Sequence, residues 1–127
     1  LPPMIAAGAL ASVRYLKRSQ KERDGQQRAV AYMREALDRA GIPHVQNDSH
    51  IVPVMVGEAD LCRALSDELL TRFGHYLQPI NYPTVARGTE RLRLTPTPLH
   101  TNEDIDEMVV ALSTLWQERQ LKRSVAA

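Results

Sequence analysis

Apolar residues recur every three or four positions in four stretches of this chain, which predicts four helices. The first begins near Pro3, because proline is tolerated in a first helical turn, and its apolar positions run through 5–16. The second is clear from Gln26 onward and ends at Gly41, a residue typical of helix ends. Gly25 weakens a helix, so the pattern leaves the start of this second helix open.

The two remaining helices have clearer patterns. Leucines and a phenylalanine recur at four-residue steps through 58–73, which predicts an amphipathic helix closed by Gly74. The last helix follows Thr101 and Asp104, a pair that approximates a capping box.

Short apolar or alternating stretches between the helices predict three strands, at 50–57, 75–80 and 91–95. Pro53 has no amide hydrogen to donate, so the first strand is expected at an edge or a bulge. The segment 81–89 contains proline and glycine and is expected to be a loop. The order α–α–β–α–β–β–α favours an α+β fold, a small sheet with helices packed on one face.

Length and charge narrow the class of protein. With 127 residues, the chain fits one ordinary domain. Sixteen Lys and Arg against 15 Asp and Glu give a net charge of +1, which argues against a nucleic-acid-binding protein. No apolar run of about 18 residues is present, so we expect no membrane-spanning helix. One cysteine, Cys62, allows no internal disulfide and is expected to be a buried, inert thiol.

The beginning of the chain leads to a separate expectation. The opening is apolar first and basic last, the reverse of a secretory signal, so we do not expect one. Leu1 is not a start methionine, and the chain opens on Pro2 and Pro3 before a helix of small residues. We therefore expect this chain to be the tail of a longer protein whose main catalytic groups lie upstream.

Two arginines on the third strand are the most suggestive polar residues. Alternation places Leu92 and Leu94 on one face and Arg91 and Arg93 on the other. An arginine held on a strand can offer a forked donor to a carboxylate or phosphate. The alternative is that both arginines are solvated or paired with the adjacent Glu90.

Other candidate residues are weaker. The Thr84 hydroxyl, in the loop, could bind a small anion or simply belong to a turn. His50, His75 and His100 fall at strand or loop ends, where a histidine can act as acid, base or ligand, but they share no metal spacing, so structural roles are favoured. His44 lies in a connector and is expected to be exposed.

Common catalytic motifs are missing. The chain has no glycine-rich phosphate loop, no G-x-S-x-G elbow and no H-E-x-x-H. Lysine occurs only at 17, 21 and 122, in charged stretches that would not lower its pKa for Schiff-base chemistry. The residues alone therefore support an accessory domain with a possible anion-binding arginine.

One string carries a family resemblance. NYPTVARGTERLRLTPTPLHT, at 81–101, resembles the C-terminal domain of 5-aminolevulinate synthases, a branch of the α-oxoamine synthases. So do GIPHVQNDSHIVPVMVG at 41–57, DELLTRFGHYLQPI at 67–80 and the opening LPPMIAAGALAS. Other α-oxoamine synthases share only a looser pattern of proline, then R-[LI]-R, then histidine. Ala86 stands where the resemblance leads us to expect proline.

The resemblance implies the C-terminal small domain of a fold type I enzyme that uses pyridoxal 5'-phosphate (PLP) and works as a homodimer. Such an enzyme condenses glycine with succinyl-CoA to give 5-aminolevulinate, CoA and CO2, for haem and porphyrin biosynthesis. It implies that the PLP lysine lies upstream, so the segment alone should be inactive and should contain no catalytic, cofactor-binding or metal-binding residue. A bacterial cytoplasm is the expected location, or the mitochondrial matrix if the source is eukaryotic.

Two functional roles carry over from the family to residues of this chain. Arg93 matches the arginine that binds the glycine carboxylate, and Thr84 matches the threonine that contacts the succinyl carboxylate. Arg91 is expected to be structural. The resemblance further implies that 1–40 is a helical segment joining a large catalytic domain to a small domain at 41–127. Two alternatives stay open: an α-oxoamine synthase with another acyl-CoA or amino acid, and a non-catalytic binding or regulatory module.

Overall fold

The fold consists of four helices and a three-stranded sheet, seen in a computed structural model that describes residues 1–124. The elements follow the predicted order, and their bounds are α1 Pro3–Leu16, α2 Lys21–Arg39, β1 Val52–Met55, α3 Ala59–Phe73, β2 Gln78–Ile80, β3 Arg91–Leu94 and α4 Asn102–Glu118. Within the described part of the chain, no helix is long and apolar enough to cross a membrane.

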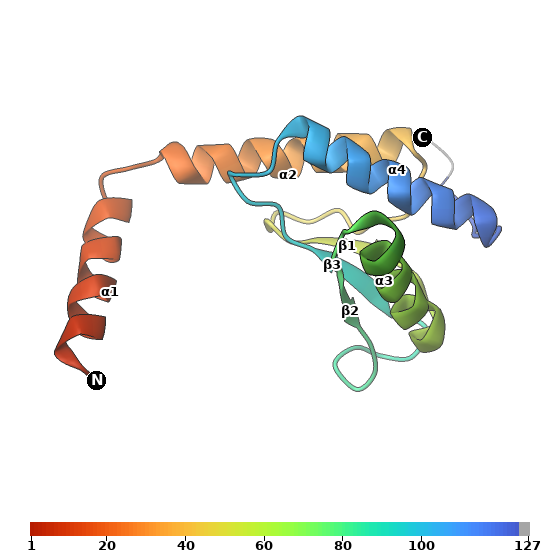
Figure 1. Cartoon of the computed structure of the whole chain (residues 1–127), viewed down its shortest axis with the longest axis horizontal. Helices are drawn as coiled ribbons and strands as arrows, with labels where there is room; N and C mark the ends of the chain where they lie inside the picture. Colours follow the sequence, from red (N-terminus) through yellow and green to blue (C-terminus); the bar gives the residue numbers. More distant parts are fainter. Residues whose placement is uncertain (125–127) are drawn as a thin grey trace.

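The sheet is antiparallel, with β3 in the centre between β1 and β2. Helices α2, α3 and α4 lie to one side of it (Figure 1). The alternating side chains Val52, Val54, Leu92 and Leu94 are buried toward these helices. The predicted α+β arrangement, a small sheet with helices on one face, is confirmed.

Strand β1 is an edge strand, as Pro53 predicted. The Pro53 carbonyl accepts a hydrogen bond from the Val45 amide at 2.9 Å, on the side away from β3. The nitrogen and carbonyl of one strand residue point to the same side, so the donor that proline lacks is not needed by the central strand.

Strand β2 is shorter than the predicted 75–80. Helix α3 ends at Gly74, whose positive φ of 77° is the left-handed conformation typical of helix ends. The His75 amide then donates to the Leu69 carbonyl at 3.0 Å. Pairing with β3 consequently begins only at Gln78.

Gly25 lies inside α2 rather than before it. A Cβ atom at this position would lie 3.1 Å from the Cβ of Pro98, so the glycine lets the loop after β3 approach the helix closely. The capping box predicted at the start of α4 is confirmed: Thr101 Oγ1 accepts from the Asp104 amide, and Asp104 Oδ2 accepts from the Thr101 amide.

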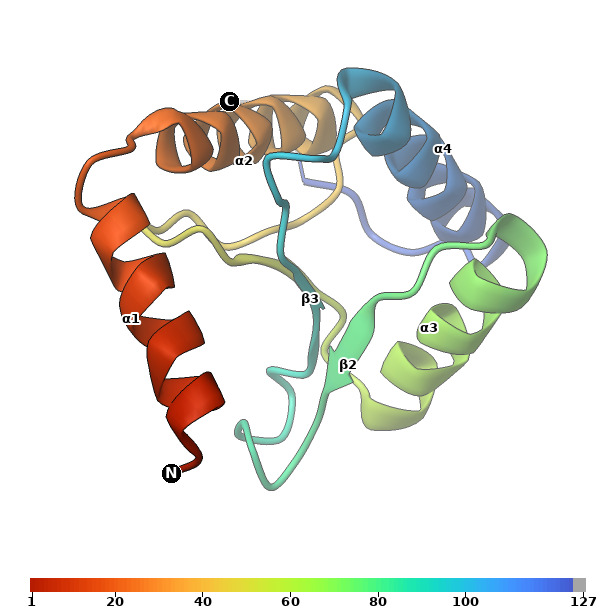
Figure 2. The same cartoon turned by 60° about the vertical axis from the view of Figure 1, so that its left-hand side comes forward.

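Helix α2 belongs to the same core as the sheet. Ala29, Val30, Met33, Ala36 and Leu37 are buried in it, and α2 packs along α4 (Figure 2). The division at residues 40 and 41 stays a prediction, part of which (125–127) lies outside the described residues.

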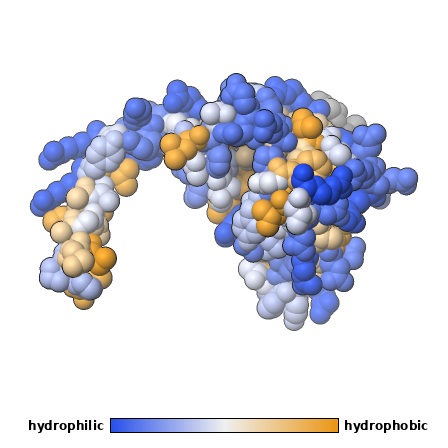
Figure 3. All heavy atoms as spheres, viewed as in Figure 1, coloured by the Kyte–Doolittle hydropathy of each residue, from blue (hydrophilic) through white to orange (hydrophobic). Residues whose placement is uncertain are grey.

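Helix α1 differs from the others because none of its residues is buried. It projects away from the sheet and the other helices (Figures 1 and 2). Figure 3 shows hydrophobic residues on the surface of this helix. Its exposed apolar residues include Met4 at 78% exposure and Ile5 at 56%. Polar contacts join α1 to α2: the Glu22 carboxylate accepts from the Tyr15 hydroxyl at 2.6 Å, and the Arg23 guanidinium donates to the Leu16 carbonyl.

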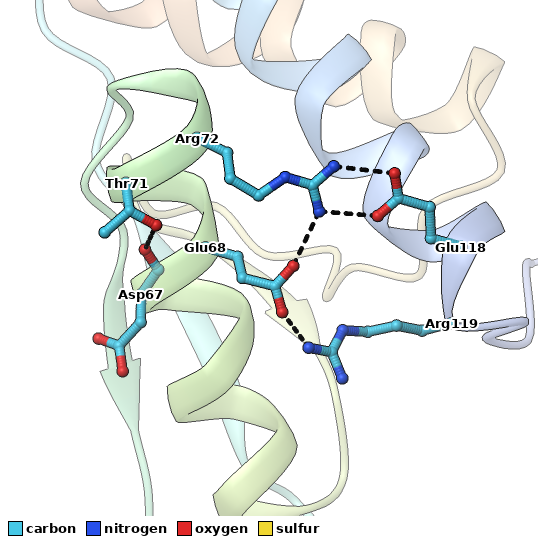
Figure 4. A network of polar contacts seen from close by, with 6 residues as sticks. All are labelled: Asp67, Glu68, Thr71, Arg72, Glu118 and Arg119. Carbon is cyan, nitrogen blue, oxygen red and sulfur yellow. Dashed lines mark hydrogen bonds and ion pairs between the residues drawn. The ribbon is translucent and has the colours of Figure 1, made fainter.

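An ion-pair network links α3 to α4 (Figure 4). The Arg72 guanidinium donates to both Glu118 carboxylate oxygens at 2.8 Å and to Glu68 at 2.9 Å. Arg119 contacts the other Glu68 oxygen. Hydrogen bonds from Arg72 hold the pKa of Glu118 below its ordinary value, and those from Arg119 and Arg72 do the same for Glu68.

The network should make stability depend on pH in the acid range. A carboxylate whose pKa is lower in the folded state stabilises the fold above its unfolded pKa, and this contribution is lost as pH falls through the folded pKa. Glu118→Gln should lower the thermal midpoint at pH 7 by a few degrees at most, because the pair is solvent-exposed. The difference from the wild type should shrink as pH falls below about 4, the ordinary range for Glu.

The matched control for this prediction is Glu107→Gln, on the same helix. Glu107 forms no ion pair among residues 1–124 and is exposed, so its substitution should leave the midpoint unchanged at both pH values. An equal effect of the two variants at pH 7 would contradict a specific role for the network.

Candidate substrate-binding site

Arg93 stands at the centre of the open face of the sheet. In the register of the strands it lies between Pro53 of β1 and Gln78 of β2. Its neighbours Leu92 and Leu94 are 0% and 4% exposed and anchor β3 in the core. The strand therefore fixes the Arg93 backbone, while alternation turns its side chain away from the helices.

The Arg93 guanidinium is available to a ligand. Its side chain is exposed and forms no hydrogen bond or ion pair with any residue of the described range. Arg91 differs, because it is half-buried and its Nε donates to the Thr89 carbonyl at 2.8 Å. Neither arginine pairs with Glu90, so the predicted pairing with Glu90 is wrong: Glu90 is buried and accepts instead from the Gly88 amide at 2.8 Å. The other part of that alternative, a solvated Arg93 without a ligand, stays open.

Arg93 lines a cavity of about 410 Å³ at the end of β3 that leads toward α4. Five other polar side chains share it: His75, Tyr76, Thr95, His100 and Asp104. Apolar side chains complete the walls, namely Met33, Leu77, Leu94, Ile105 and Met108. A cavity with an apolar wall and a few convergent polar groups is the kind of site that binds small molecules.

The polar groups of the cavity are partly held by the fold. The Thr97 amide donates to His100 Nδ1 at 3.0 Å, so the neutral ring carries its proton on Nε2. Hydrogen bonds from the backbone and then the side chain of Thr101 lower the pKa of Asp104, with a further contribution from the nearby His100 and His75. The carboxylate of Asp104 is therefore engaged in capping α4.

Thr84 lies outside this cavity. It sits in the exposed loop between β2 and β3, which leaves at Ile80 and returns at Arg91, at the opposite end of these strands from the cavity. Its amide donates to the Asn81 carbonyl at 2.9 Å, and its hydroxyl has no partner among residues 1–124. Arg93 and Thr84 therefore do not share one cavity: Arg93 lies near one end of β3, and Thr84 lies in the loop that precedes the other end.

The loop around Thr84 has internal contacts of its own. The Tyr82–Pro83 bond is cis, and the Arg87 guanidinium lies over the Tyr82 ring, 4.5 Å from its centroid. The side-chain amide of Asn81 donates to the Ala59 carbonyl of α3 at 3.2 Å, which fixes the start of the loop.

The predictions for the remaining candidate residues, Cys62, His44 and His50, have different outcomes. Cys62 is buried, and burial raises the pKa of its thiol, as expected for an inert residue. His44 was expected to be exposed, but its side chain is only 3% exposed because residues 43–45 pair with the outer edge of β1. His50 is exposed and does not line the cavity.

Sequence reasoning missed the burial of Glu90, the contact of Asn81 with α3, and the presence of Tyr76 and Asp104 in the cavity lining. Glu90 carried a signal, since alternation places it on the same face as Leu92 and Leu94. The other residues come together only through tertiary packing, which no local pattern records.

Among residues 1–124, no lysine has the surroundings expected for the lysine that holds the cofactor implied by the resemblance. PLP is held by a lysine amine whose pKa is lowered by burial or by a neighbouring cation. All three lysines, Lys17, Lys21 and Lys122, are exposed. No cluster of His, Cys, Asp and Glu within 1–124 could hold a metal ion.

The sequence of this chain matches known proteins of one family. The family model for class I and II aminotransferases matches residues 1–112. The chain therefore belongs to the class I and II aminotransferase family.

Particular relatives are more specific. The chain is 59% identical over 126 residues to a 5-aminolevulinate synthase of Rhizobium meliloti (strain 1021), covering 99% of this chain and 31% of that protein. It is 51% identical over 123 residues to a mitochondrial 5-aminolevulinate synthase of Yarrowia lipolytica (strain CLIB 122 / E 150), covering 97% and 22%. The resemblance to 5-aminolevulinate synthases is confirmed, and the chain spans about a third of the length of the bacterial relative.

A solved structure agrees on the fold. Serine palmitoyltransferase from S. paucimobilis, with bound PLP-myriocin aldimine, superposes with a TM-score of 0.86 at 23% identity. The match covers 96% of this chain and 31% of that protein.

The two arginines should differ in their effect on stability. Arg91→Leu removes a hydrogen bond to the Thr89 carbonyl and should cost about 1 kcal/mol of unfolding free energy. Arg93→Leu, which removes no contact, should change it by less than about 0.5 kcal/mol. Urea unfolding of both variants measures this, and an Arg93→Leu loss as large as that of Arg91→Leu would show that Arg93 is a structural residue.

Proposed function

We propose that this chain forms the substrate-binding lobe of a 5-aminolevulinate synthase, which condenses glycine with succinyl-CoA and releases CoA and CO2. The observation that carries the proposal is the 59% identity to the R. meliloti enzyme over 99% of this chain. The Arg93 guanidinium on β3, which is free to bind a carboxylate, gives this lobe a role in holding a substrate.

The proposal requires a longer polypeptide than the present chain. In this proposal the lysine and the other groups that hold PLP belong to residues beyond this segment, which is in keeping with the exposure of all three lysines here. PLP, when bound there, supplies the electron sink that allows bonds at the glycine α-carbon to break. This chain contributes the recognition of the substrates. We further propose that the protein works as a homodimer in haem and porphyrin biosynthesis.

Arg93 binds the glycine carboxylate in this proposal. Glycine has no side chain to recognise, so its carboxylate is the group by which an enzyme can orient it. A guanidinium offers two parallel N–H donors to a carboxylate and so limits its rotation. The anchored strand β3 holds this donor in place, which favours one orientation of the bonds at the α-carbon.

Thr84 contacts the succinyl carboxylate. Its hydroxyl is a small neutral donor without an internal partner in the described structure, on a loop at the other end of β3 from the cavity. The two substrate carboxylates would then be recognised by different elements of one lobe. A hydroxyl donor at this position favours a charged acyl chain over an apolar one of the same length.

The proposed cellular location is taken from the names of the relatives. The Yarrowia protein is named as mitochondrial. We propose the cytoplasm for a bacterial source and the mitochondrial matrix for a eukaryotic one.

A sister reaction with another acyl-CoA is the second candidate function. It is favoured by the serine palmitoyltransferase fold, which superposes with a TM-score of 0.86. The two candidates are separated by assaying a protein that contains this chain, at the length of its relatives, with glycine and a panel of acyl-CoA donors. Aminolevulinate from succinyl-CoA supports the first, and turnover of a different donor supports the second.

In the same protein, Arg93→Leu should raise the glycine KM at least about tenfold, equivalent to about 1.4 kcal/mol of lost binding. The succinyl-CoA KM should change much less. Steady-state kinetics with each substrate varied in turn measures both values. An unchanged glycine KM would remove Arg93 from the site.

Thr84→Val should mainly impair succinyl-CoA. The substitution keeps the shape of the side chain and removes the hydroxyl, so the preference for succinyl-CoA over butyryl-CoA should narrow by about tenfold, the effect of one lost hydrogen bond to a charged group. Competition between the two donors measures this ratio. An equal decrease with both donors would contradict the role of Thr84 as a carboxylate ligand.

A further inference from the structure

Glu90 is a buried carboxylate that the proposed function does not use. The residue is 3% exposed, and only one other polar or charged residue, Ser66, is classed as buried within 1–124. It directly precedes β3 and therefore lies between the loop that carries Thr84 and the strand that carries Arg93. Alternation turns its side chain toward the helices, near Cys62 of α3.

A buried charge needs compensation, because removal from water is costly. Glu90 forms no ion pair with the residues of the described range. Within residues 1–124, the hydrogen-bond partner of its side chain is the backbone amide of Gly88, which donates to Oε2 at 2.8 Å. A hydrogen bond to an ionised acceptor is about twice as strong as a neutral one.

The backbone of the same residue joins a second segment. The Glu90 carbonyl accepts from the Val56 amide at 3.0 Å and from the Gly57 amide at 2.9 Å, at the end of β1. Glu90 thus connects the last turn of the loop, through Gly88, to the connection between β1 and α3. Gly88 has a φ of 83°, a left-handed conformation that suits glycine, so the carboxylate holds a turn that most residues would not adopt.

The loop is tied at both ends and exposed between them. Asn81 holds the first end through the Ala59 carbonyl, and Glu90 holds the last end through Gly88. Residues 82–84 and 86–88 between these ties are exposed. The position of the Thr84 hydroxyl consequently depends on where the two ties place the loop.

We propose that Glu90 is a positioning residue for acyl-donor selectivity: its buried carboxylate fixes the loop through Gly88, and thereby places Thr84 for the succinyl carboxylate. The functional part of this inference rests on the proposed function. Glu90 itself touches no substrate.

Two substitutions of similar side-chain length test whether Glu90 acts as a hydrogen-bond acceptor for Gly88 or through its negative charge. Glu90→Met removes the acceptor and should lower the ratio of succinyl-CoA to butyryl-CoA turnover about tenfold, with the glycine KM unchanged. Glu90→Gln keeps an oxygen that can accept from Gly88 and should retain the ratio within about threefold. Glu107→Met, at an exposed position of α4, is the control for the introduced methionine and should leave the ratio unchanged.

A double-mutant cycle tests whether Glu90 acts through Thr84. In the Thr84→Val background, Glu90→Met should cause no further decrease in the donor ratio. An additional tenfold decrease would show that Glu90 acts by another route and would overturn the inference. An unchanged donor ratio in Glu90→Met would also overturn the inference, provided that the wild type produces aminolevulinate. A wild type that produces no aminolevulinate would overturn the proposed function instead.

Amide hydrogen exchange tests the hydrogen bond between Gly88 and Glu90 without any substitution, so the test does not depend on whether Glu90→Met folds. In the full wild-type chain, the Gly88 amide should exchange at least about tenfold more slowly than that of Arg87, after correction for intrinsic rates. The Arg87 amide has no hydrogen-bond partner among residues 1–124. Equal exchange of the two amides would overturn the inference, whatever the activity of the protein.

Discussion

The alternation of side chains along one central strand determines most of this structure. Leu92 and Leu94 are buried against the helices, and Arg91 and Arg93 point the other way. Because β3 is paired on both sides, its backbone has little freedom to turn these residues. The burial of two leucines therefore holds an unpaired guanidinium at a defined place on the open face of the sheet, and the proposed recognition of glycine depends on this arrangement.

The two ends of β3 have different surroundings, so the proposed contacts to glycine and to the acyl donor lie at different places. One end opens into the cavity shared by Arg93, His75 and His100. The other end receives the loop of Thr84, which is tied down by Asn81 and Glu90. A short rigid strand between the two suits an enzyme that must hold one carboxylate firmly and choose an acyl donor by another, as we propose. The exposed lysines and the unburied helix α1 agree with a lobe that works beside other parts of a longer protein.

The order and type of the elements could be predicted from the sequence because each rests on local chemistry. The edge position of β1 follows from the missing amide hydrogen of Pro53, and the start of α4 follows from the pairing of Thr101 with Asp104. The exposure of Arg93 follows from strict alternation. Its role as a substrate ligand came from the family resemblance and stays a prediction, as does the role of Thr84.

The features that could not be predicted depend on contacts between distant segments. Gly25 lies within α2, where the absence of a side chain leaves room for Pro98, far along the chain. His44 is buried by its pairing with β1, and β2 is short because the end of α3 engages the His75 amide. The sequence suggests Glu90 as an ion-pair partner of the adjacent arginines, whereas in the structure a backbone amide two residues away provides its hydrogen bond.

The most direct test of the central claim is a crystal structure, with glycine and PLP bound, of a protein that contains this chain at the length of its relatives. The account predicts that two guanidinium nitrogens of Arg93 lie within about 3 Å of the glycine carboxylate oxygens. A glycine carboxylate bound entirely by other residues, with the Arg93 side chain turned away from it, would contradict the account.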